Sequence, residues 1–310
     1  MSSVLKPGKT AVITGASSGI GKAAALDFAA RGMNVWLVDV DQDELQAATE
    51  LAKSKCLDAS KQTIVGKVVD VSDEAAMKKL ADEVFETNQN CHFLFNNAGI
   101  QLSVPAGGIL ANNHAMKSTL DVNLYGPIHG CLAFVPKMKA SGEECIVVNT
   151  GSKQGITMPP GNLPYNVSKA ALKCYTEGLE HDLRNSPDSK VRAALLVPGW
   201  VNTSIVLKNE RMEALAKDPE TIFDPDSVFF HEDKPASGAW MPKQLIDFMV
   251  EELDQGKFYL IAPDNDVDRL TDNIRMTWTM QDITQDRPPL SRWHPEYKDK
   301  FTEYLKENKK

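Results

Sequence analysis

The sequence has no long apolar run: no stretch of its 310 residues approaches the roughly 18 consecutive apolar residues that a transmembrane helix requires. Its first residues contain no apolar segment of the kind found in a signal peptide. The five cysteines (Cys56, Cys91, Cys131, Cys145 and Cys174) are scattered and include no Cys-x-x-Cys pair, which indicates reduced thiols. These absences predict a cytoplasmic protein with no membrane partner.

Basic residues are too few for a nucleic-acid-binding surface. Lys and Arg number 34 against 42 Asp and Glu, which gives a formal net charge of −8. Binding to a phosphate backbone requires an excess of positive charge, so we expect no nucleic-acid partner. The six histidines are equally dispersed, and we expect no metal site. The 42% hydrophobic and 25% charged composition is that of an ordinary globular protein.

Short β-rich apolar runs alternate with longer helical patterns, which is typical of a parallel sheet with crossover helices. The solid apolar character of the runs fits strands that are covered on both faces. We therefore predict an α/β fold, a single doubly wound (Rossmann-type) domain with a parallel seven-stranded sheet over residues 1–263. The predicted strands are 10–14, 34–39, 63–69, 93–96, 145–149, 191–197 and 257–261, and the predicted helices 19–31, 42–54, 73–88, 111–139 and 164–184.

Two segments depart from this alternation. Residues 204–238 carry many apolar side chains without a clear strand, and a connection of this length in an α/β domain predicts a substrate lid. Residues 264–310 form a C-terminal extension that begins with a plausible helix and continues to the aromatic residues Trp293, Tyr297, Phe301 and Tyr304. Its periodicity favours a packing or subunit-contact element over a catalytic one.

A glycine-rich loop directly follows the first predicted strand and leads into a helix of small residues. Its residues are Thr14, Gly15, Ala16, Ser17, Ser18, Gly19, Ile20 and Gly21. Glycines in such a loop let the backbone approach a pyrophosphate, and the helix N-terminus supplies N–H groups and partial positive charge. Asp39 ends the second predicted strand, where a carboxylate can bind ribose hydroxyls. The pattern predicts a dinucleotide-binding site.

Asp39 also bears on the choice of cofactor. A carboxylate at this place repels a 2′-phosphate, and an NADP site would want an Arg or Lys nearby. Position 18 is Ser, and residues 40–43 read Val-Asp-Gln-Asp, with no cation. We therefore expect NAD in preference to NADP.

Tyr165 and Lys169 are four residues apart, which places both side chains on one face of a helix. An ammonium beside a phenol stabilises the phenolate, so we expect the pKa of Tyr165 to lie below its usual value of about 10. A tyrosine tuned in this way can exchange a proton with a carbonyl or an alcohol oxygen.

With these motifs in their order, the chain resembles the short-chain dehydrogenase/reductase family over about residues 8–205 and, more loosely, 239–262. The residues that carry the resemblance are Thr14–Gly21, Asp70-Val71, Asn96-Asn97-Ala98-Gly99, Asn123, Ser152, Tyr165 with Lys169, and Pro198-Gly199 leading to Thr203. The family's usual form implies a homodimer or a homotetramer, with a dimer through the helices around 111–139 and 164–184.

The resemblance also implies roles for single residues. Tyr165 would be the general acid/base, Lys169 would lower its pKa and bind the nicotinamide ribose, and Ser152 would hold the substrate oxygen. Asn123 would position a water in a proton relay. The remaining cofactor contacts implied are Asp70, Val71, Asn97, Ala98, Gly99, Pro198, Val201 and Thr203. Singly, each has a plainer interpretation: Ser152 could be a turn or capping serine, and Asn123 an ordinary buried amide.

The function predicted from these residues is NAD-dependent interconversion of a secondary alcohol and a ketone by hydride transfer. The pocket walls should come from 101–110, 153–163, 200–205 and the lid, and their apolar residues favour an apolar or ring-containing substrate, unless they only pack the lid. His114, Lys153 and Gln154 could orient a polar substituent or face water. Two alternatives stay open: an NADPH-dependent carbonyl reductase, and a catalytically silent NAD-binding regulatory protein.

Overall fold

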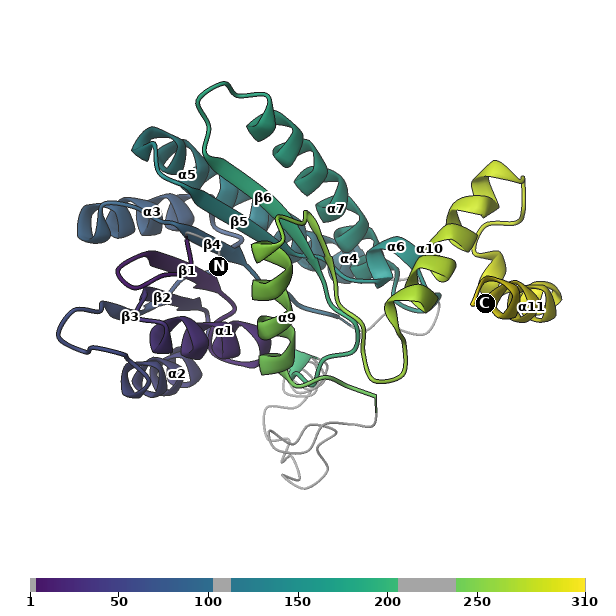
Figure 1. Ribbon diagram of the computed structural model, residues 1–310, viewed down its shortest axis with the longest axis horizontal. Coiled ribbons are helices and arrows are strands. Elements are labelled where there is room, and N and C mark those ends of the chain that lie inside the picture. Colours follow the sequence, from purple (N-terminus) through teal and green to yellow (C-terminus); the bar gives the residue numbers. More distant parts are fainter. Residues whose placement is uncertain (1–3, 103–112, 206–237, 310) are drawn as a thin grey trace.

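The computed structural model describes residues 4–102, 113–205 and 238–309, and its centre is one parallel sheet of seven strands (Figure 1). The strands are β1 (Thr10–Thr14), β2 (Asn34–Asp39), β3 (Ile64–Val68), β4 (Phe93–Asn96), β5 (Cys145–Thr150), β6 (Val191–Val197) and β7 (Tyr259–Ile261). Their order across the sheet is β3-β2-β1-β4-β5-β6-β7, and each neighbouring pair is parallel. The predicted doubly wound α/β fold is confirmed.

Helices cover both faces of the sheet because its strands are apolar on both sides. In β4, Phe93 and Phe95 join the core beneath one face, whereas Leu94 joins the core beneath the other. Helices α1 (Gly19–Ala30), α2 (Gln42–Ser54) and α9 (Pro242–Asp254) form the first layer. Helices α3 (Glu74–Asn88), α5 (Gly126–Ser141) and α7 (Leu163–Arg184) form the second.

The long helix predicted over 111–139 is not regular. Its first residues lie outside the described part of the chain, and α4 (Asn113–Leu120) passes into a π-helical turn (Asp121–Tyr125) before α5 begins. A π turn widens the helix by one residue and re-aims the side chains within it. Asn123 lies in this turn and is fully buried. Local propensity does not reveal such a turn, which explains the difference.

The C-terminal extension packs against the domain at one end only. Helix α10 (Arg269–Thr284) starts beside the short helix α6 (Gln154–Thr157), and the chain then leads away from the sheet to α11 (Lys298–Asn308), as Figure 1 shows. Two single 3₁₀ turns, Ser291–Trp293 and Pro295–Tyr297, connect the two helices. Within the extension, Trp278 packs against Phe301 and Tyr304, with ring centres 5.2 and 5.0 Å away.

Most of the predicted lid, residues 206–237, lies outside the described residues. In the part of the chain that the structure describes, no helix combines the length and the apolar character needed to cross a bilayer.

Candidate active site

The residues expected to act together meet at the carboxyl ends of the central strands. The sheet order reverses direction between β1 and β4, and in open α/β sheets such a switch point opens a crevice where ligands bind. The glycine loop follows β1, the Asn97–Gly99 segment follows β4, and Ser152 follows β5. Helix α7 brings Tyr165 and Lys169 to the same edge, since its backbone packs directly against α6 at Gly155.

Close packing requires glycine at two places in the loop after β1. Gly15 has φ of 65°, and a β-carbon there would lie 2.8 Å from Ala98 Cα. A β-carbon on Gly21 would lie 2.1 Å from the Gly15 carbonyl oxygen. The loop therefore presses against the β4 end, and α1 begins within it at Gly19. Ser17 is buried, whereas Ser18, Gly19 and Ile20 are partly exposed.

Asp39 fixes the shape of the crevice beside this loop. Its Oδ2 accepts a hydrogen bond of 3.0 Å from Ser17 N, and its Oδ1 accepts from Val40 N at 2.8 Å. A second carboxylate, that of Glu44 on α2, accepts a 3.4 Å hydrogen bond from the Ser17 hydroxyl. Sequence reasoning missed Glu44, because its approach to Ser17 depends on how α2 packs beside α1. Two carboxylates thus contact Ser17 in the glycine loop.

The segment after β4 is bound to the β1 end by its backbone. Thr14 Oγ1 accepts hydrogen bonds of 3.0 Å from both Asn97 N and Ala98 N. Asn97 Nδ2 donates to the Thr14 carbonyl oxygen at 3.1 Å. Gly99 lies close to the Asn123 side chain, since a β-carbon there would be 3.3 Å from Asn123 Oδ1.

The other predicted cofactor contacts follow β3 and β6. Asp70 is exposed and accepts from the Ser72 hydroxyl at 2.7 Å, while Val71 is buried against the α3–α5 layer. Thr203 lies against the glycine loop, with Cγ2 3.1 Å from the place that a β-carbon on Gly19 would take. Pro198 and Val201, on the chain that leaves β6, are partly exposed.

Tyr165 and Lys169 project from the first turns of α7 toward the β5 end. Lys169 is buried, and its Nζ lies 5.6 Å from the centre of the Tyr165 ring. The same Nζ donates a 2.7 Å hydrogen bond to the Thr150 carbonyl oxygen, at the last residue of β5. Ser152 lies two residues further and contacts the Tyr165 side chain.

The pKa shifts of Tyr165 and Lys169 differ from those expected from their spacing. Burial raises the pKa of Tyr165, and the contact with Ser152 lowers it by less. Burial also lowers the pKa of Lys169 from 10.5 to about 8. The expected lowering of the tyrosine pKa by its neighbour is therefore wrong for the structure as described. The reason is that burial penalises the Tyr165 phenolate more than the hydrogen bond with Ser152 favours it.

Ser152 and Asn123 also have the structural roles considered as alternatives above, those of a turn serine and of a buried amide. The Ser152 hydroxyl accepts a 3.1 Å hydrogen bond from Gln154 N, as a turn serine does. Asn123 makes a two-way pair with Ile100: its Oδ1 accepts from Ile100 N and its Nδ2 donates to Ile100 O, both at 2.8 Å. Asn123 Nδ2 also approaches Ser168 Oγ at 3.2 Å, and that hydroxyl donates to the Tyr165 carbonyl at 2.8 Å.

The expected substrate walls are described only in part. Residues 103–112 lie outside the described chain, and so does the lid apart from its first two residues and Gly238. Of the three polar candidates, Lys153 does not face water: it forms ion pairs with Asp264 and Asp272. No sequence pattern marked this pairing.

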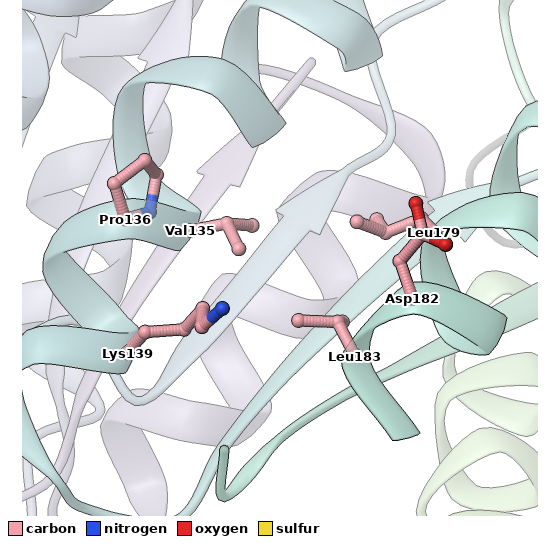
Figure 2. A pocket seen from close by; sticks show the side chains of 6 residues that line it. All are labelled: Val135, Pro136, Lys139, Leu179, Asp182 and Leu183. Carbon is pink, nitrogen blue, oxygen red and sulfur yellow. The ribbon is translucent and has the colours of Figure 1, made fainter. Parts of the chain in front are cut away.

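A hollow of about 470 Å³ between α5 and α7 is a separate feature (Figure 2). It is lined by Val135, Pro136, Lys139, Leu179, Asp182 and Leu183. Asp182 lies seventeen positions after Tyr165 on α7, which at about 1.5 Å per residue puts the hollow about 25 Å from Tyr165. The hollow is therefore remote from the predicted catalytic residues. Among the residues described, no three His, Cys, Asp or Glu side chains gather as metal ligands do.

Comparison with known proteins agrees with this geometry. The model of the short chain dehydrogenase family matches residues 9–214. A 1-deoxy-11-beta-hydroxypentalenate dehydrogenase from Streptomyces avermitilis is 33% identical over 196 residues, which is 63% of this chain and 69% of the relative. The crystal structure of a short chain dehydrogenase/reductase from Burkholderia phymatum in complex with NAD is 29% identical. It covers 92% of this chain and 97% of its own, with a TM-score of 0.77.

A further solved structure is that of L-sorbose reductase from Gluconobacter frateurii, complexed with NADPH and L-sorbose. It is 25% identical, with a TM-score of 0.64, and it covers 80% of this chain and 90% of its own. The fold and the crevice define an oxidoreductase of the class that uses a nicotinamide cofactor. The chain belongs to the short-chain dehydrogenase/reductase family.

Proposed function

We propose that this protein is an NAD-dependent oxidoreductase that interconverts a secondary alcohol and a ketone. The observation that carries the proposal is the meeting of Tyr165, Lys169 and Ser152 at the β5 end, beside the glycine loop after β1. The reaction needs a proton donor and acceptor next to the place where the substrate oxygen binds.

Two features of the loop after β1 support a dinucleotide site. The loop leaves no room for a β-carbon at Gly21, and it leads into the N-terminus of α1, whose N–H groups would bind a pyrophosphate. The residues that would hold the cofactor are Gly15, Ser17, Ser18, Gly19, Ile20, Gly21, Asp39, Asp70, Val71, Asn97, Ala98, Gly99, Tyr165, Lys169, Pro198, Val201 and Thr203. The bound nicotinamide supplies or accepts the hydride.

The side chains of this protein move the proton and hold the oxygen. In the ketone direction Tyr165 donates its phenolic proton to the carbonyl oxygen, and in the alcohol direction its phenolate accepts the hydroxyl proton. Ser152 donates a hydrogen bond to the same oxygen and stabilises the charge that develops there. Lys169, fixed by the Thr150 carbonyl, stabilises the phenolate and holds the ribose. Asn123 keeps the Ile100 backbone in place and positions a water for the proton relay.

The two carboxylates beside Ser17 support the preference for NAD over NADP. Asp39 and Glu44 both contact Ser17, and either would repel a 2′-phosphate. Fluorescence titration with NADH and NADPH tests this, and the expected result is tighter binding of NADH. Tighter binding of NADPH would identify the protein as an NADPH-dependent carbonyl reductase and overturn the role given to Asp39.

We further propose an apolar or ring-containing small-molecule substrate, because the wall residues Met158 and Trp200 are exposed beside the site. Assembly as a homodimer or homotetramer and a cytoplasmic location belong to the same proposal. So does the division into a catalytic domain over residues 1–263, with a lid at 204–238, and a C-terminal extension over 264–310.

The decisive experiment replaces Tyr165 with Phe and follows NADH absorbance with a panel of hydrophobic alcohols and ketones. We expect kcat to fall by about 10³-fold or more, because the proton donor is lost, while NADH binding changes little. The control is Tyr259→Phe, which removes a partly exposed hydroxyl bound to Glu177, outside the crevice. Retained turnover in Tyr165→Phe would refute the assignment. NADH binding by the wild type without turnover on any substrate would instead identify a silent binding protein.

A further inference from the structure

A buried ammonium lies directly behind the active-site serine. Lys153 follows Ser152, and its Nζ lies 2.6 Å from Asp272 Oδ2 and 3.4 Å from Asp264 Oδ2. The three side chains are nearly closed to solvent, with exposed fractions of 15% for Lys153, 9% for Asp264 and 3% for Asp272. The three belong to different parts of the chain: the turn after β5, the turn after β7, and helix α10.

Asp264 extends this cluster to the turn after β6. Its Oδ2 accepts a 3.1 Å hydrogen bond from Trp200 N, in the segment that leads to Val201 and Thr203. Its Oδ1 accepts from Val267 N at 2.8 Å and so shapes the chain that enters α10. At Gly199 the fit is tight, since a β-carbon would lie 2.7 Å from Asp264 Oδ2 and 2.9 Å from Lys153 Nζ. One ammonium therefore connects the ends of β5, β6 and β7.

Asp272 connects Lys153 to the C-terminal extension, because it belongs to helix α10. It lies one turn into α10, and the helix also packs by Met276 against a cluster that includes Ile156 of α6. Besides Lys153, the charge of Arg275 favours the ionised Asp272 carboxylate, whereas that of Asp264 disfavours it. Lys153 Nζ contacts Asp272 directly, at 2.6 Å.

We propose that Lys153 is a positioning residue that couples the C-terminal extension to the Ser152 turn and to the Pro198–Trp200 turn. The extension is then part of the frame that holds the active site. The link to catalysis rests on the proposed function, whereas the coupling of the two turns does not depend on it.

Stability alone does not explain this arrangement. A buried ion pair gains little over apolar residues of the same volume, because the cost of removing the charges from water offsets their attraction. A charged group with two fixed carboxylates does, however, specify one geometry, since any shift of α10 leaves a buried charge without its partner. Ser152 needs such precision, because displacing a catalytic group by about 1 Å can reduce the rate about 100-fold.

The coupling can be tested without any substrate by hydrogen–deuterium exchange. Two amides report on the two turns: Gln154 N, which donates to Ser152 Oγ, and Trp200 N, which donates to Asp264. We expect Asp272→Asn, an isosteric change in α10, to speed exchange at both turns about tenfold or more. Lys153→Met should do the same. The matched control is Lys309→Met, which removes an exposed ion pair with Asp268 in the same extension and should leave both amides unchanged.

Unchanged exchange at both turns in Asp272→Asn, in a folded protein, would overturn the proposal. Faster exchange spread evenly over the whole chain would also overturn it, because that result indicates a merely structural role. If Lys153→Met does not fold, the test uses Asp272→Asn and the double variant Lys153→Met/Asp272→Asn. The double variant removes one charge of each sign. The double variant should be no worse than the worse single variant, since the two residues act through one contact.

Kinetics then tests the link to catalysis. We expect Asp272→Asn to lower kcat about tenfold, because Ser152 is displaced, and to raise the KM for NAD by a smaller factor, because the Pro198–Trp200 turn leads to the predicted cofactor contacts Val201 and Thr203. Lys309→Met should keep the wild-type kcat. If exchange at the Ser152 turn rises but kcat does not fall, the extension does not position the catalytic group. If the wild type turns over no alcohol or ketone, the proposed function fails, and the exchange result still decides the coupling.

Discussion

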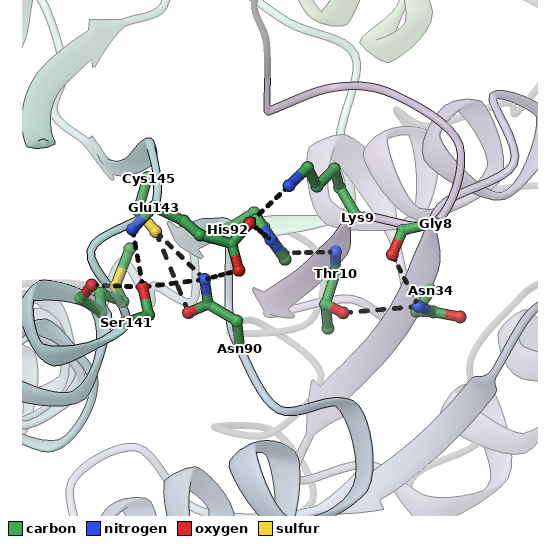
Figure 3. A network of polar contacts seen from close by, with 10 residues as sticks. Gly8, Lys9, Thr10, Asn34, Asn90, His92, Ser141, Glu143 and Cys145 are labelled. Carbon is green, nitrogen blue, oxygen red and sulfur yellow. Dashed lines mark hydrogen bonds and ion pairs between the residues drawn. The ribbon is translucent and has the colours of Figure 1, made fainter.

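Polar clusters of different character lie at the amino ends and at the carboxyl ends of the central strands, here called the amino edge and the carboxyl edge. At the amino edge, Figure 3 shows Lys9, Asn90, His92 and Glu143 bound to one another and to the β1 start. At the carboxyl edge, Tyr165 and Lys169 are held by fewer contacts. Both clusters connect neighbouring strands, so position in the sheet does not separate a structural cluster from a candidate catalytic one.

The polar side chains of the amino-edge cluster are hydrogen-bonded to one another and to the backbone. His92 Nδ1 accepts a 3.1 Å hydrogen bond from Thr10 N, which leaves Nε2 to donate to Glu143 Oε2 at 3.1 Å. Lys9 Nζ lies 2.6 Å from the same carboxylate oxygen. Lys9 and His92 together lower the pKa of Glu143 to about 2, with Lys9 the larger cause. Each of these side chains thus has a partner in the protein, and the remaining donors of Lys9, which is 33% exposed, face water.

The carboxyl-edge cluster keeps capacity for a ligand. Within the described chain, Lys169 Nζ donates one hydrogen bond, to Thr150, although an ammonium has three donors. Burial holds the pKa of Lys169 near 8 and raises that of Tyr165. Within the described residues, the partners of these two groups therefore do not offset the free energy that burial of their charged forms costs. Buried polar groups whose partners are incomplete therefore indicate a candidate functional site better than burial or charge alone.

Of the substitutions considered, Lys169→Met should have the largest effect, because it changes activity and stability in opposite directions. We expect kcat to fall about 10²- to 10⁴-fold, because the phenolate loses its cation. We also expect the free energy of unfolding at pH 7 to rise by about 2 kcal/mol, since the pKa of about 8 marks an ammonium that burial disfavours. Steady-state kinetics and urea unfolding measure the two effects.

The pH dependence of stability tests whether burial of the Lys169 ammonium is the reason for this gain. Between about pH 8 and pH 10.5 the unfolded chain holds a proton on Lys169 that the native protein has lost. Stability of the wild type should therefore rise with pH in this window, and the rise should be missing in Lys169→Met. A variant less stable than the wild type would show that the bond to Thr150 outweighs the cost of burial.

The direction of catalysis should depend on pH with a sign fixed by Tyr165. Because burial raises the pKa of Tyr165, the phenol stays protonated through neutral pH. Ketone reduction, which needs the proton, should keep its kcat/KM from pH 6 to 8 and lose it in alkali. Alcohol oxidation, which needs the phenolate, should rise about tenfold per pH unit in the same range. Alcohol oxidation that peaks below pH 7 would show that the bound cofactor lowers this pKa.

The sheet and the cofactor loop could be predicted from the sequence because their signals are local. The bounds predicted for β1, β2, β4 and β6 are those found, since an apolar run with turn residues at both ends defines a buried strand. The spacing of Tyr165 and Lys169 placed both on one helix face for the same reason.

Features that depend on distant contacts could not be predicted. Lys153 and Asp264 are 111 positions apart, and no periodicity connects them. The pKa shifts of Tyr165 and Lys169 depend on how deeply α7 is packed, whereas the spacing reports only their separation. His92 appeared as one of six dispersed histidines, because its partners come from β1 and from the turn before β5.

His92→Phe tests the other side of the comparison, at the amino edge. We expect it to lower the free energy of unfolding by about 2 kcal/mol, because the buried Thr10 N–H loses its acceptor, and to leave kcat per folded molecule unchanged. Burial lowers the pKa of His92, so below pH 6.5 the unfolded chain binds a proton that the native protein does not. The wild type should lose stability as the pH falls below 6.5, and the variant should lose less. His92→Asn, which keeps an acceptor, is the control, and a fall in kcat would show that the two edges are coupled.

Lys9→Met should have the smallest effect, although Lys9 contributes most to the low pKa of Glu143. The two side chains are 33% and 46% exposed, so solvent screens their attraction, and we expect a loss of at most about 0.5 kcal/mol at pH 7. The stability that the pair contributes is present above the usual Glu pKa and is lost as the pH falls toward 2. Urea unfolding at low and high salt measures this loss of stability, with Lys53→Met, which removes another exposed ion pair, as the control.

A loss above about 1.5 kcal/mol that persists in high salt would mean that Lys9, Glu143 and His92 act as one cooperative network. The amino edge would then resemble the active-site edge in its sensitivity to single substitutions, and only kcat would distinguish them.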